Sequence, residues 1–489
     1  MVNRSASWVD PLVPWALAAI CATVFLVGHW LTRDVLPLRP DTAGYLYFDP
    51  SRPIGYPFFL WFVNLFGSPV LSVTVQKLLL TISLFLLGLT FYRWSGRPIL
   101  SVLFQLGLVL SPEMWKFSGG MNAEALGTAA VALWCAQLIR TLQTPSPRAI
   151  GFLSIIAGVA MLVKPSLVML FIGTAVASFL LQTSRERGAG LILAAAGLII
   201  SLAVTPLANL FLHGSTASGS PVARGVLQHT LFCTPSKLPT DPDSAFVEQY
   251  SKAVRDYISS APPSTHHALK RIYTGKLRFG LIIPTLGRRH GLQASWQTDP
   301  LIWKIAKDRI FANPGCYARS VIGSYFNLAT YQSYSSAEVR RLREWLAAKP
   351  PIEVPIVRAL PNDEQLAKWA AHEVGHPELR LPGRRSFEPP TGRPLALVWM
   401  ARLIYGSAAI AGLISAFLLL APVKLETDLR RLLICTAALG VVFHGVVGLT
   451  AFVELHLTRY NVALGPVVCV LLGMLAITAF NRLNSARSG

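Results

Sequence analysis

Residues 190–212 read GLILAAAGLIISLAVTPLANLFL, and no charged side chain interrupts them. A helix that crosses the hydrocarbon core of a bilayer needs about 20 apolar residues, so this stretch predicts a membrane-spanning helix. The whole chain shares this character. Of its 489 residues, 53% are hydrophobic and 14% are charged, whereas about 25% of the residues of an ordinary soluble domain are charged. The sequence therefore predicts an integral membrane protein.

The chain contains further apolar stretches of similar length, several of them with Gly or Pro inside. The predicted spans are 11–31, 69–92, 98–112, 122–141, 149–163, 166–183, 190–212, 396–421, 432–450 and 460–480. The predicted fold class is an all-α polytopic membrane protein with about ten transmembrane helices. Residues 1–212 would form a membrane core of about seven spans. Residues 213–395 would form an outer, mainly helical domain, and residues 396–489 would add about three C-terminal spans.

Lys and Arg residues in the short connections predict the orientation, because cytoplasmic loops carry an excess of these residues. With alternating spans they fall on one side: Arg4, Arg93, Arg97, Arg140, Arg148, Arg185, Arg187, Lys424, Arg430, Arg431 and Arg482. We therefore expect both termini in the cytoplasm, and the 213–395 segment and the Asp41 loop outside. The remainder of the formal charge of +20 could attract anionic headgroups or an acidic substrate.

Prolines and capping residues mark the ends of helices in the outer segment. We expect helices at 299–313, 339–348 and 363–372. The same segment contains Cys233 and Cys316, while the other four cysteines lie in apolar stretches. Because an outer compartment is oxidising, we predict a disulfide between Cys233 and Cys316. Two unrelated free thiols are the alternative.

The stretch from His372 to His376 reads HEVGH, which matches the zinc-protease pattern H-E-x-x-H. That pattern needs a continuous helix, on which two imidazoles one turn apart bind the metal and the Glu activates water. Here Gly375 weakens the helix, and Pro377 pushes His376 towards an extended conformation. The same letters are typical of a helix C-terminus. A zinc metalloprotease is therefore the less favoured interpretation.

Ionisable and polar residues gather at the predicted outer ends of the spans. An ionisable group at such a depth costs several kcal/mol unless it is paired or wetted, so each invites a functional interpretation. The residues are Asp41 after the first span, Asn122 and Glu124 at the start of the fourth, Lys164 between the fifth and sixth, and Arg459 with Tyr460 before the tenth. Together they would supply carboxylates and cations on one side of the membrane.

Each of these residues also has a structural explanation. Asp41 could be a solvated loop acid, and Glu124 a first-turn acid favoured by the helix dipole. Lys164 could reach the headgroups, and Arg459 could pair with Glu454. The aromatic residues between 45 and 66 could form an interfacial belt or a helix in the membrane plane.

The order of the motifs along the chain resembles that of the GT-C glycosyltransferases. These membrane enzymes use polyprenyl-phosphate sugars, as protein O-mannosyltransferases and the aminoarabinose transferase acting on lipid A do. The motifs are Asp-x-x-x-Tyr from Asp41, Arg-Pro-x-Gly-Tyr-Pro-x-Phe-Leu from Arg52, Asn-x-Glu from Asn122, Lys-Pro from Lys164 and Arg-Tyr-x-x-x-x-x-Pro from Arg459. The likeness covers the first seven spans best. The chain departs from the family's pattern at two positions. It has a single acid at Asp41, where many relatives have two neighbouring acids, and it has Lys164 where many relatives have Arg.

The resemblance implies transfer of one sugar from an undecaprenyl or related phosphate carrier to an acceptor outside the cytoplasm, with inversion at the anomeric carbon. Asp41 would be the general base for the acceptor hydroxyl. Arg459, Lys164 and Arg52 would stabilise the donor phosphate. Residues that would position the acceptor or substrate are Glu124, Asn122, Tyr45, Tyr56 and Tyr460.

The expected partners are the polyprenyl-phosphate sugar donor, a lipid, glycan or protein acceptor, and the lipids of a bacterial cytoplasmic membrane. Nucleic acid is not expected, because no basic cluster alternates with exposed aromatics. A divalent cation is possible but not favoured, since Asp41 has no neighbouring carboxylate. The alternative from another class is a transporter or flippase for a lipid-linked sugar. Such a protein should place ionisable groups nearer the middle of the membrane.

Overall fold

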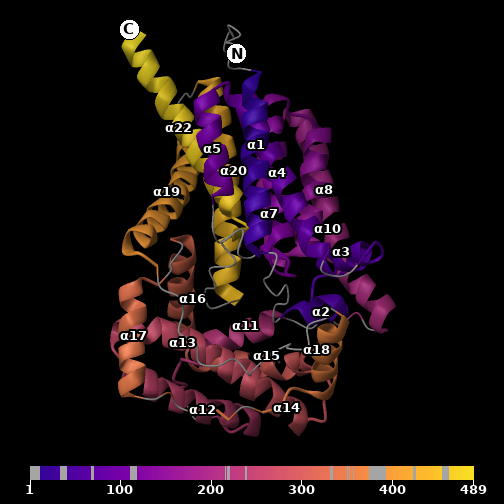
Figure 1. Ribbon diagram of the computed structural model, residues 1–489, viewed down its shortest axis with the longest axis vertical. Coiled ribbons are helices and arrows are strands. Elements are labelled where there is room, and N and C mark those ends of the chain that lie inside the picture. The colour runs from indigo at the N-terminus through magenta and orange to yellow at the C-terminus, as the bar shows by residue number, and fades with distance from the viewer. Residues whose placement is uncertain are drawn as a thin grey trace.

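The computed structural model describes residues 11–32, 41–67, 71–110, 118–214, 216, 221–236, 239–330, 334–349, 351, 353–355, 357–373, 393–421, 426–453 and 462–488. These residues form helices and their connections, with one isolated bridge between Ser335 and Arg393. The helices make two groups (Figure 1), a bundle and a second group at one end of it. Helix α1 begins and α22 ends at the opposite end of the bundle, remote from the second group.

The bundle contains one helix at each predicted span. Its helices are α1 (Leu12–Thr32), α4 (Leu71–Ser95), α5 (Pro98–Val109), α7 (Glu124–Gln143), α8 (Pro147–Val163), α9 (Met169–Leu181), α10 (Ser184–His213), α19 (Leu395–Leu420), α20 (Thr427–Val453) and α22 (Gly465–Ser488). Among the described helices, six are long and apolar enough to cross a membrane: α1, α4, α7, α10, α19 and α20. The apolar parts of α5, α8, α9 and α22 are shorter. The chain is an all-α membrane protein.

Close packing of small residues and satisfied polar groups hold the bundle together. A Cβ atom on Gly412 would lie 2.6 Å from the Cα atom of Gly440, so α19 and α20 approach each other as closely as their backbones allow. Trp134 of α7 is fully buried, and its indole N–H donates to Oγ1 of Thr174 in α9 at 3.0 Å. The bundle therefore has a rigid interior that can hold its ends in place.

The second group comprises α11 (Pro221–Thr230), α12 (Pro242–Ser259), α13 (His266–Gly275), the π-helical η3 (Lys276–Ile282), α14 (Ile283–Arg289), α15 (Asp299–Ala312), α16 (Pro314–Ala329), α17 (Ser336–Ala348) and α18 (Pro361–Glu373). The three helices expected here from the sequence are confirmed as α15, α17 and α18. The capping box is also present: Ser335 Oγ accepts from the Glu338 N–H at 3.2 Å, and Glu338 Oε2 accepts from the Ser335 N–H at 2.7 Å. Local sequence signals were sufficient for these helices.

A buried ion cluster and a disulfide stabilise the second group. Glu248 accepts hydrogen bonds from Arg255 and, at 2.8 Å, from Arg309, and all three side chains are largely buried. Burial lowers the pKa of Arg309, while the Glu248 charge raises it. Nearby, the sulfurs of Cys233 and Cys316 are bonded and join the end of α11 to the start of α16. This is the pair that the sequence singled out.

Helices α16 and α11 fix the second group to the bundle. Tyr317 of α16 belongs to the core of the second group, whereas Leu328, three turns later, belongs to the core of the bundle. The amide of Gln228 in α11 donates to the carbonyl of Val453, at the end of α20, at 3.3 Å. The second group therefore covers one end of the bundle, and the residues there lie between the two groups (Figure 1).

Candidate active site

Asp41 lies at the start of a short helix, α2 (Thr42–Leu46), and forms an ion pair. Its Oδ1 accepts a hydrogen bond from Nη2 of Arg52 at 2.7 Å. The Asp41 side chain is 19% exposed and that of Arg52 is 28% exposed. The Arg52 guanidinium also lies 5.2 Å from the centroid of the Tyr45 ring, within the range of a cation–π contact. Asp41 is therefore a partly buried, ion-paired acid rather than a fully solvated one.

A tight turn folds Arg52 back over α2. The N–H of Asp49 donates to the Gly44 carbonyl at 2.9 Å, and the N–H of Arg52 donates to the Asp49 carbonyl at 2.8 Å. Phe48 has a φ of 54°, in the left-handed region, and its carbonyl accepts a hydrogen bond from Nε2 of His213 at 2.7 Å. A Cβ atom on Gly44 would come within 3.1 Å of Arg52 Nε. Glycine at this position leaves room for Arg52 to reach Asp41.

The next helix, α3 (Gly55–Asn64), packs against α2. The ring of Tyr45 meets the ring of Tyr56 edge to face, with centroids 4.8 Å apart. Both rings belong to one buried cluster with Leu60, Ala123 and Val163, so four elements converge here: α2, α3, the start of α7 and the end of α8. Four of the predicted site motifs therefore meet at one end of the bundle.

Helix α3 has two different faces. Tyr56, Leu60 and Val63 are buried against the bundle. Phe58, Trp61 and Phe62 are about half exposed and point away from it. An apolar helix that buries one face in protein and leaves aromatic rings on the other is typical of a helix that lies in the membrane interface. This arrangement agrees with the expectation of an in-plane aromatic helix beside Asp41.

Gln76 of α4 joins α3 to the loop before α7. Its Oε1 accepts a hydrogen bond from the Tyr56 hydroxyl at 2.8 Å. Its Nε2 donates to the carbonyls of Ser118, at 2.8 Å, and Gly120, at 2.7 Å. Gln76, Tyr56 and Ser118 are fully buried. Both N–H donors and the oxygen of this one amide are therefore used, and they hold together α3, α4 and the loop before α7.

Asn122 and Glu124 lie at the start of α7 and are almost completely buried. Oδ1 of Asn122 accepts from the N–H of Glu124 at 3.2 Å, which satisfies one of the orphan donors in the first turn of the helix. The adjacent residue Met121 accepts a hydrogen bond from Oγ1 of Thr42 at 3.2 Å. Thr42 follows Asp41 directly, so the loop that carries Asn122 and Glu124 is tied to the base of α2.

Lys164 ends α8 and is also buried. A Cβ atom on Gly127 would lie 3.8 Å from Cδ of Lys164, so the lysine side chain runs along α7 about one turn beyond Glu124. The backbone of Leu162 lies against Gly55, where a Cβ atom would meet it at 2.7 Å. The end of α8 is therefore packed between α7 and the first residue of α3. This places Lys164 with the other predicted residues.

Two further predicted residues, Arg459 and Tyr460, lie outside the described residues, as does Glu454. The described chain runs to Val453 at the end of α20 and resumes at Val462. The carbonyl of Val453 accepts a hydrogen bond from Gln228 of α11, which belongs to the second group. The assignment of Arg459 and Tyr460 to the site therefore remains a prediction from the sequence.

The sequence analysis did not single out Gln76 or Lys77. The Lys77 side chain is only 2% exposed, although it lies within the apolar helix α4. Val73, one turn earlier, packs on Met121 of the site loop. An ionisable side chain inside a predicted span is itself a signal of function, and that signal could have identified Lys77. No comparable signal marks Gln76, because its role depends on which loops the fold brings to it.

The second group meets the Asp41 loop through α18. Trp369 lies against Tyr47, with ring centroids 4.1 Å apart. In the same helix, Oδ1 of Asp363 accepts a hydrogen bond from the Ser295 N–H at 3.3 Å. Burial raises the pKa of Asp363 to about 6, and the negative charge of Asp49 contributes in the same direction. The charge of Asp49, in the turn that holds Arg52, therefore affects the pKa of an acid in α18.

The HEVGH pattern falls at the end of α18. His372 is exposed and Glu373 is the last residue of the helix, whereas Val374, Gly375 and His376 lie outside the described residues. In the part of the chain that the structure describes, no group of three or more His, Cys, Asp or Glu side chains could hold a metal ion.

Comparison of the chain with protein-family models, with curated proteins and with solved structures gave no match. The function is consequently argued from the residues at this end of the bundle.

Proposed function

We propose that the chain is a membrane glycosyltransferase that moves a sugar from a polyprenyl-phosphate donor to an acceptor hydroxyl at the outer face of the cytoplasmic membrane. The observation that carries the proposal is the convergence of the α2 carboxylate with buried cations and amides. Asp41 is paired with Arg52 at 2.7 Å. The start of α7 brings Asn122 and Glu124 to the same end of the bundle, and the end of α8 brings Lys164 there.

The proposed chemistry needs a base on one side of the anomeric carbon and positive charge on the other. Asp41 takes the proton of the acceptor hydroxyl as the oxygen forms its bond to the anomeric carbon. The bond from that carbon to the phosphate oxygen breaks, and the polyprenyl phosphate leaves as an anion that needs no proton. Attack opposite the leaving group inverts the configuration of the sugar.

Cations at the site stabilise the charge that develops on the leaving phosphate. Lys164 provides a compact charge beside α7, and Arg459 is assigned to the same task from the sequence alone. Arg52 donates to Asp41 at 2.7 Å. We propose that Arg52 orients the base and also faces the phosphate, as the motif of which it is part implies.

The proposal includes an orientation. We infer about ten spans, with both termini in the cytoplasm and the second group outside. Two features support it: α1 begins and α22 ends at the end of the bundle remote from the second group (Figure 1), and the disulfide lies within that group. Disulfides form in oxidising compartments. The Asp41 site would then face outwards, where the exposed aromatic face of α3 meets the interface.

The experiment is a transfer assay on the purified chain in lipid nanodiscs. A panel of radiolabelled undecaprenyl-phosphate sugars serves as donors, and envelope lipid and glycan extracts serve as acceptors. The wild type is compared with Asp41→Asn. Loss of a general base reduces the rate by about 10²- to 10⁴-fold, so we expect turnover to fall by at least about 100-fold. The mass and anomeric configuration of the product identify the transfer.

Asp49→Asn is the matched control, because it removes one carboxylate from the same turn. Asp49 Oδ1 accepts from the Ser51 N–H at 2.7 Å, and an Asn oxygen keeps that bond. We expect the control to retain more than about half of the wild-type turnover, since a surface substitution of this kind changes stability by less than about 0.5 kcal/mol. Equal turnover in Asp41→Asn and the wild type would end the assignment of the base. A transporter would instead move the donor across the bilayer without forming a glycosidic bond.

A further inference from the structure

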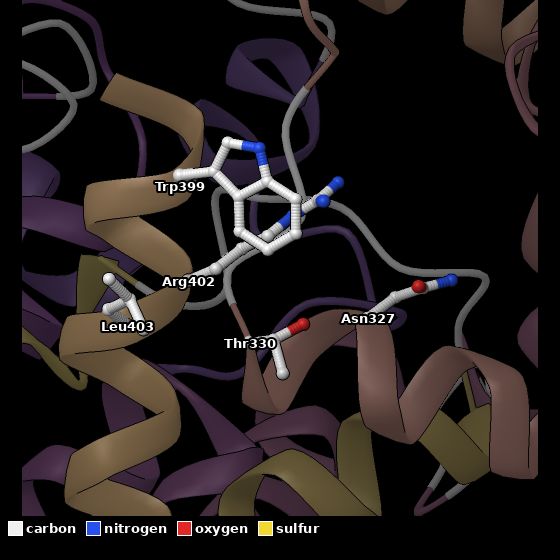
Figure 2. Close-up of a pocket in the computed structure, with 5 residues that line it drawn as sticks. All are labelled: Asn327, Thr330, Trp399, Arg402 and Leu403. Carbon is white, nitrogen blue, oxygen red and sulfur yellow. The ribbon is translucent and has the colours of Figure 1, made fainter. Parts of the chain in front are cut away.

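A pocket of about 420 Å³ lies between α16 and α19, away from the Asp41 site. It is lined by Asn327 and Thr330 of α16 and by Trp399, Arg402 and Leu403 of α19. Figure 2 shows the Arg402 side chain, which extends from α19 past the Trp399 ring towards the wall of the pocket formed by α16. In Figure 1, α16 and α19 lie on one flank of the molecule, and α2 and α3 lie on the other. The pocket is therefore separate from the proposed active site.

The surface around this pocket is apolar on both helices. Ile322 and Phe326 of α16 are 54% and 60% exposed, and Met400 and Leu403 of α19 are 53% and 66% exposed. Exposed large hydrophobic residues that gather in this way mark a surface that contacts membrane or another protein. Since α19 is one of the helices long and apolar enough to span a bilayer, its exposed side chains are suited to contact with lipid.

The length of α19 sets the depth of the pocket. Its 26 residues extend about 39 Å, whereas the hydrocarbon core is about 30 Å thick. Arg402 lies about 10 Å along the helix from its first residue, so it falls near the boundary between hydrocarbon and headgroups. Trp399 lies one turn before it, and Trp and Arg are both residues that anchor a helix at this boundary.

We infer that this pocket binds the headgroup of an anionic membrane phospholipid. The Arg402 guanidinium, 5.2 Å from the centroid of the Trp399 ring, supplies the charge for the phosphate. The Asn327 amide supplies a hydrogen bond from the opposite wall, and the acyl chains lie over Phe326 and Leu403. The Thr330 hydroxyl donates to the Phe326 carbonyl at 2.8 Å, so it can accept a hydrogen bond from a headgroup hydroxyl. A free phosphate ion would gain nothing from those apolar neighbours, which is why the occupant is a lipid. Basic pockets between transmembrane helices bind acidic headgroups in the same way.

A lipid in this position would bridge the two groups of helices. Near the pocket, the Tyr325 hydroxyl bonds to Nδ1 of His444 at 2.5 Å, and Nε2 of His444 donates to the Ala409 carbonyl at 3.0 Å. These contacts join α16, α20 and α19. A headgroup held by both α16 and α19 would add a further link at the edge of the same contact. The lipid is thus expected to stabilise the contact between the second group and the bundle.

The test is native mass spectrometry of the detergent-purified full chain, titrated with phosphatidylglycerol or phosphatidylcholine. Arg402→Gln should weaken the binding of phosphatidylglycerol by about tenfold or more, because a hydrogen bond to a charged group contributes about 1.5–3 kcal/mol. Phosphatidylcholine should bind weakly to both proteins. The matched control is Arg289→Gln, which removes an arginine from an equivalent aromatic contact, 4.5 Å from the Phe246 ring in the second group. The control should bind lipid as the wild type does.

A second variant keeps the test decisive if Arg402→Gln does not fold. Asn327→Leu changes the other wall and should also weaken the binding of phosphatidylglycerol. Equal binding by the wild type, Arg402→Gln and Asn327→Leu would overturn the inference, and so would an Arg402-dependent site that takes polyprenyl phosphate and not phosphatidylglycerol. Asp41→Asn should bind phosphatidylglycerol normally. Failure of the transferase proposal would therefore leave this result unaffected.

Discussion

Replacing Gln76 by Leu tests whether one buried amide organises the candidate site. The substitution keeps the approximate volume of the side chain and removes three buried hydrogen bonds, to the Tyr56 hydroxyl and to the Ser118 and Gly120 carbonyls. A buried hydrogen bond contributes about 1 kcal/mol net, so the three bonds together contribute about 3 kcal/mol, which is a large part of the 5–15 kcal/mol typical of a folded domain. The Gly120 carbonyl keeps one bond, from the Asn122 N–H at 2.9 Å.

Gln105→Leu is the matched control, because it changes the same residue type in the same bundle. Gln105 is also fully buried, but its one hydrogen bond to a side chain is a donation to Cys21 Sγ at 3.0 Å. Its Oε1 has no hydrogen-bond partner among the described residues. Gln105 packs against Gly88, which lies about 18 Å along α4 from Gln76. We expect this variant to unfold at about the wild-type temperature or slightly above it.

The assay is thermal unfolding in nanodiscs, with hydrogen exchange to locate the effect. Gln76→Leu should lower the unfolding midpoint and increase exchange in α2, α3 and the start of α7. The Tyr56→Phe substitution should cost less in the Gln76→Leu background than in the wild type, because their shared bond is already lost. Equal unfolding midpoints for Gln76→Leu and Gln105→Leu, together with unchanged exchange in α2 and α3, would refute this reasoning.

Two further predictions concern the second group. The pKa of Asp363 is raised from 3.8 to about 6, so the folded state favours the protonated acid, and its contribution to stability is present below about pH 4 and lost as the pH rises through 6. Asp363→Asn should therefore raise the unfolding midpoint at pH 7.5, by an amount equivalent to at most about 3 kcal/mol, and by about a third as much at pH 4.5; equal shifts at both pH values would contradict this. The bond between Cys233 and Cys316 closes a loop with a sequence separation of 83. Cys233→Ala with Cys316→Ala should destabilise the second group by as much as about 4.5 kcal/mol, and intact mass with and without reductant should differ by two hydrogen atoms in the wild type alone.

Local signals made many of the helices predictable. The capping box at Ser335 and Glu338 and the Asp-Pro start of α15 act within a few residues, so their effect does not depend on distant parts of the chain. The apolar stretches could be recognised equally well, because a helix that spans a bilayer needs a continuous hydrophobic stretch whatever its neighbouring helices are. The small helices α2 and α3 were harder to predict from the sequence, since their positions depend on the contacts that they make with α4, α7 and α8.

The sequence nominated residues for the candidate site but could not give their geometry. The order of short motifs drew attention to Asp41, Lys164 and Glu124. The sequence could not say that the nearest described cation to Asp41 is Arg52, because that contact depends on a turn in which Gly44 leaves space for the side chain. Nor could it show that Gln76 holds the site together. A buried glutamine in an apolar helix has no partner until the loop before α7 is folded against it.

The sequence by itself determined that this chain is an all-α membrane protein with a helical segment between its apolar stretches, because apolar length, capping residues and prolines act locally or through the solvent. Only the tertiary structure decided which side chains share the end of the bundle beneath the second group. It also decided that side chains of α16 and α19, Arg402 among them, line one pocket. Both arrangements join residues far apart in the sequence, and their energies come from packing and burial that exist only once the helices have come together.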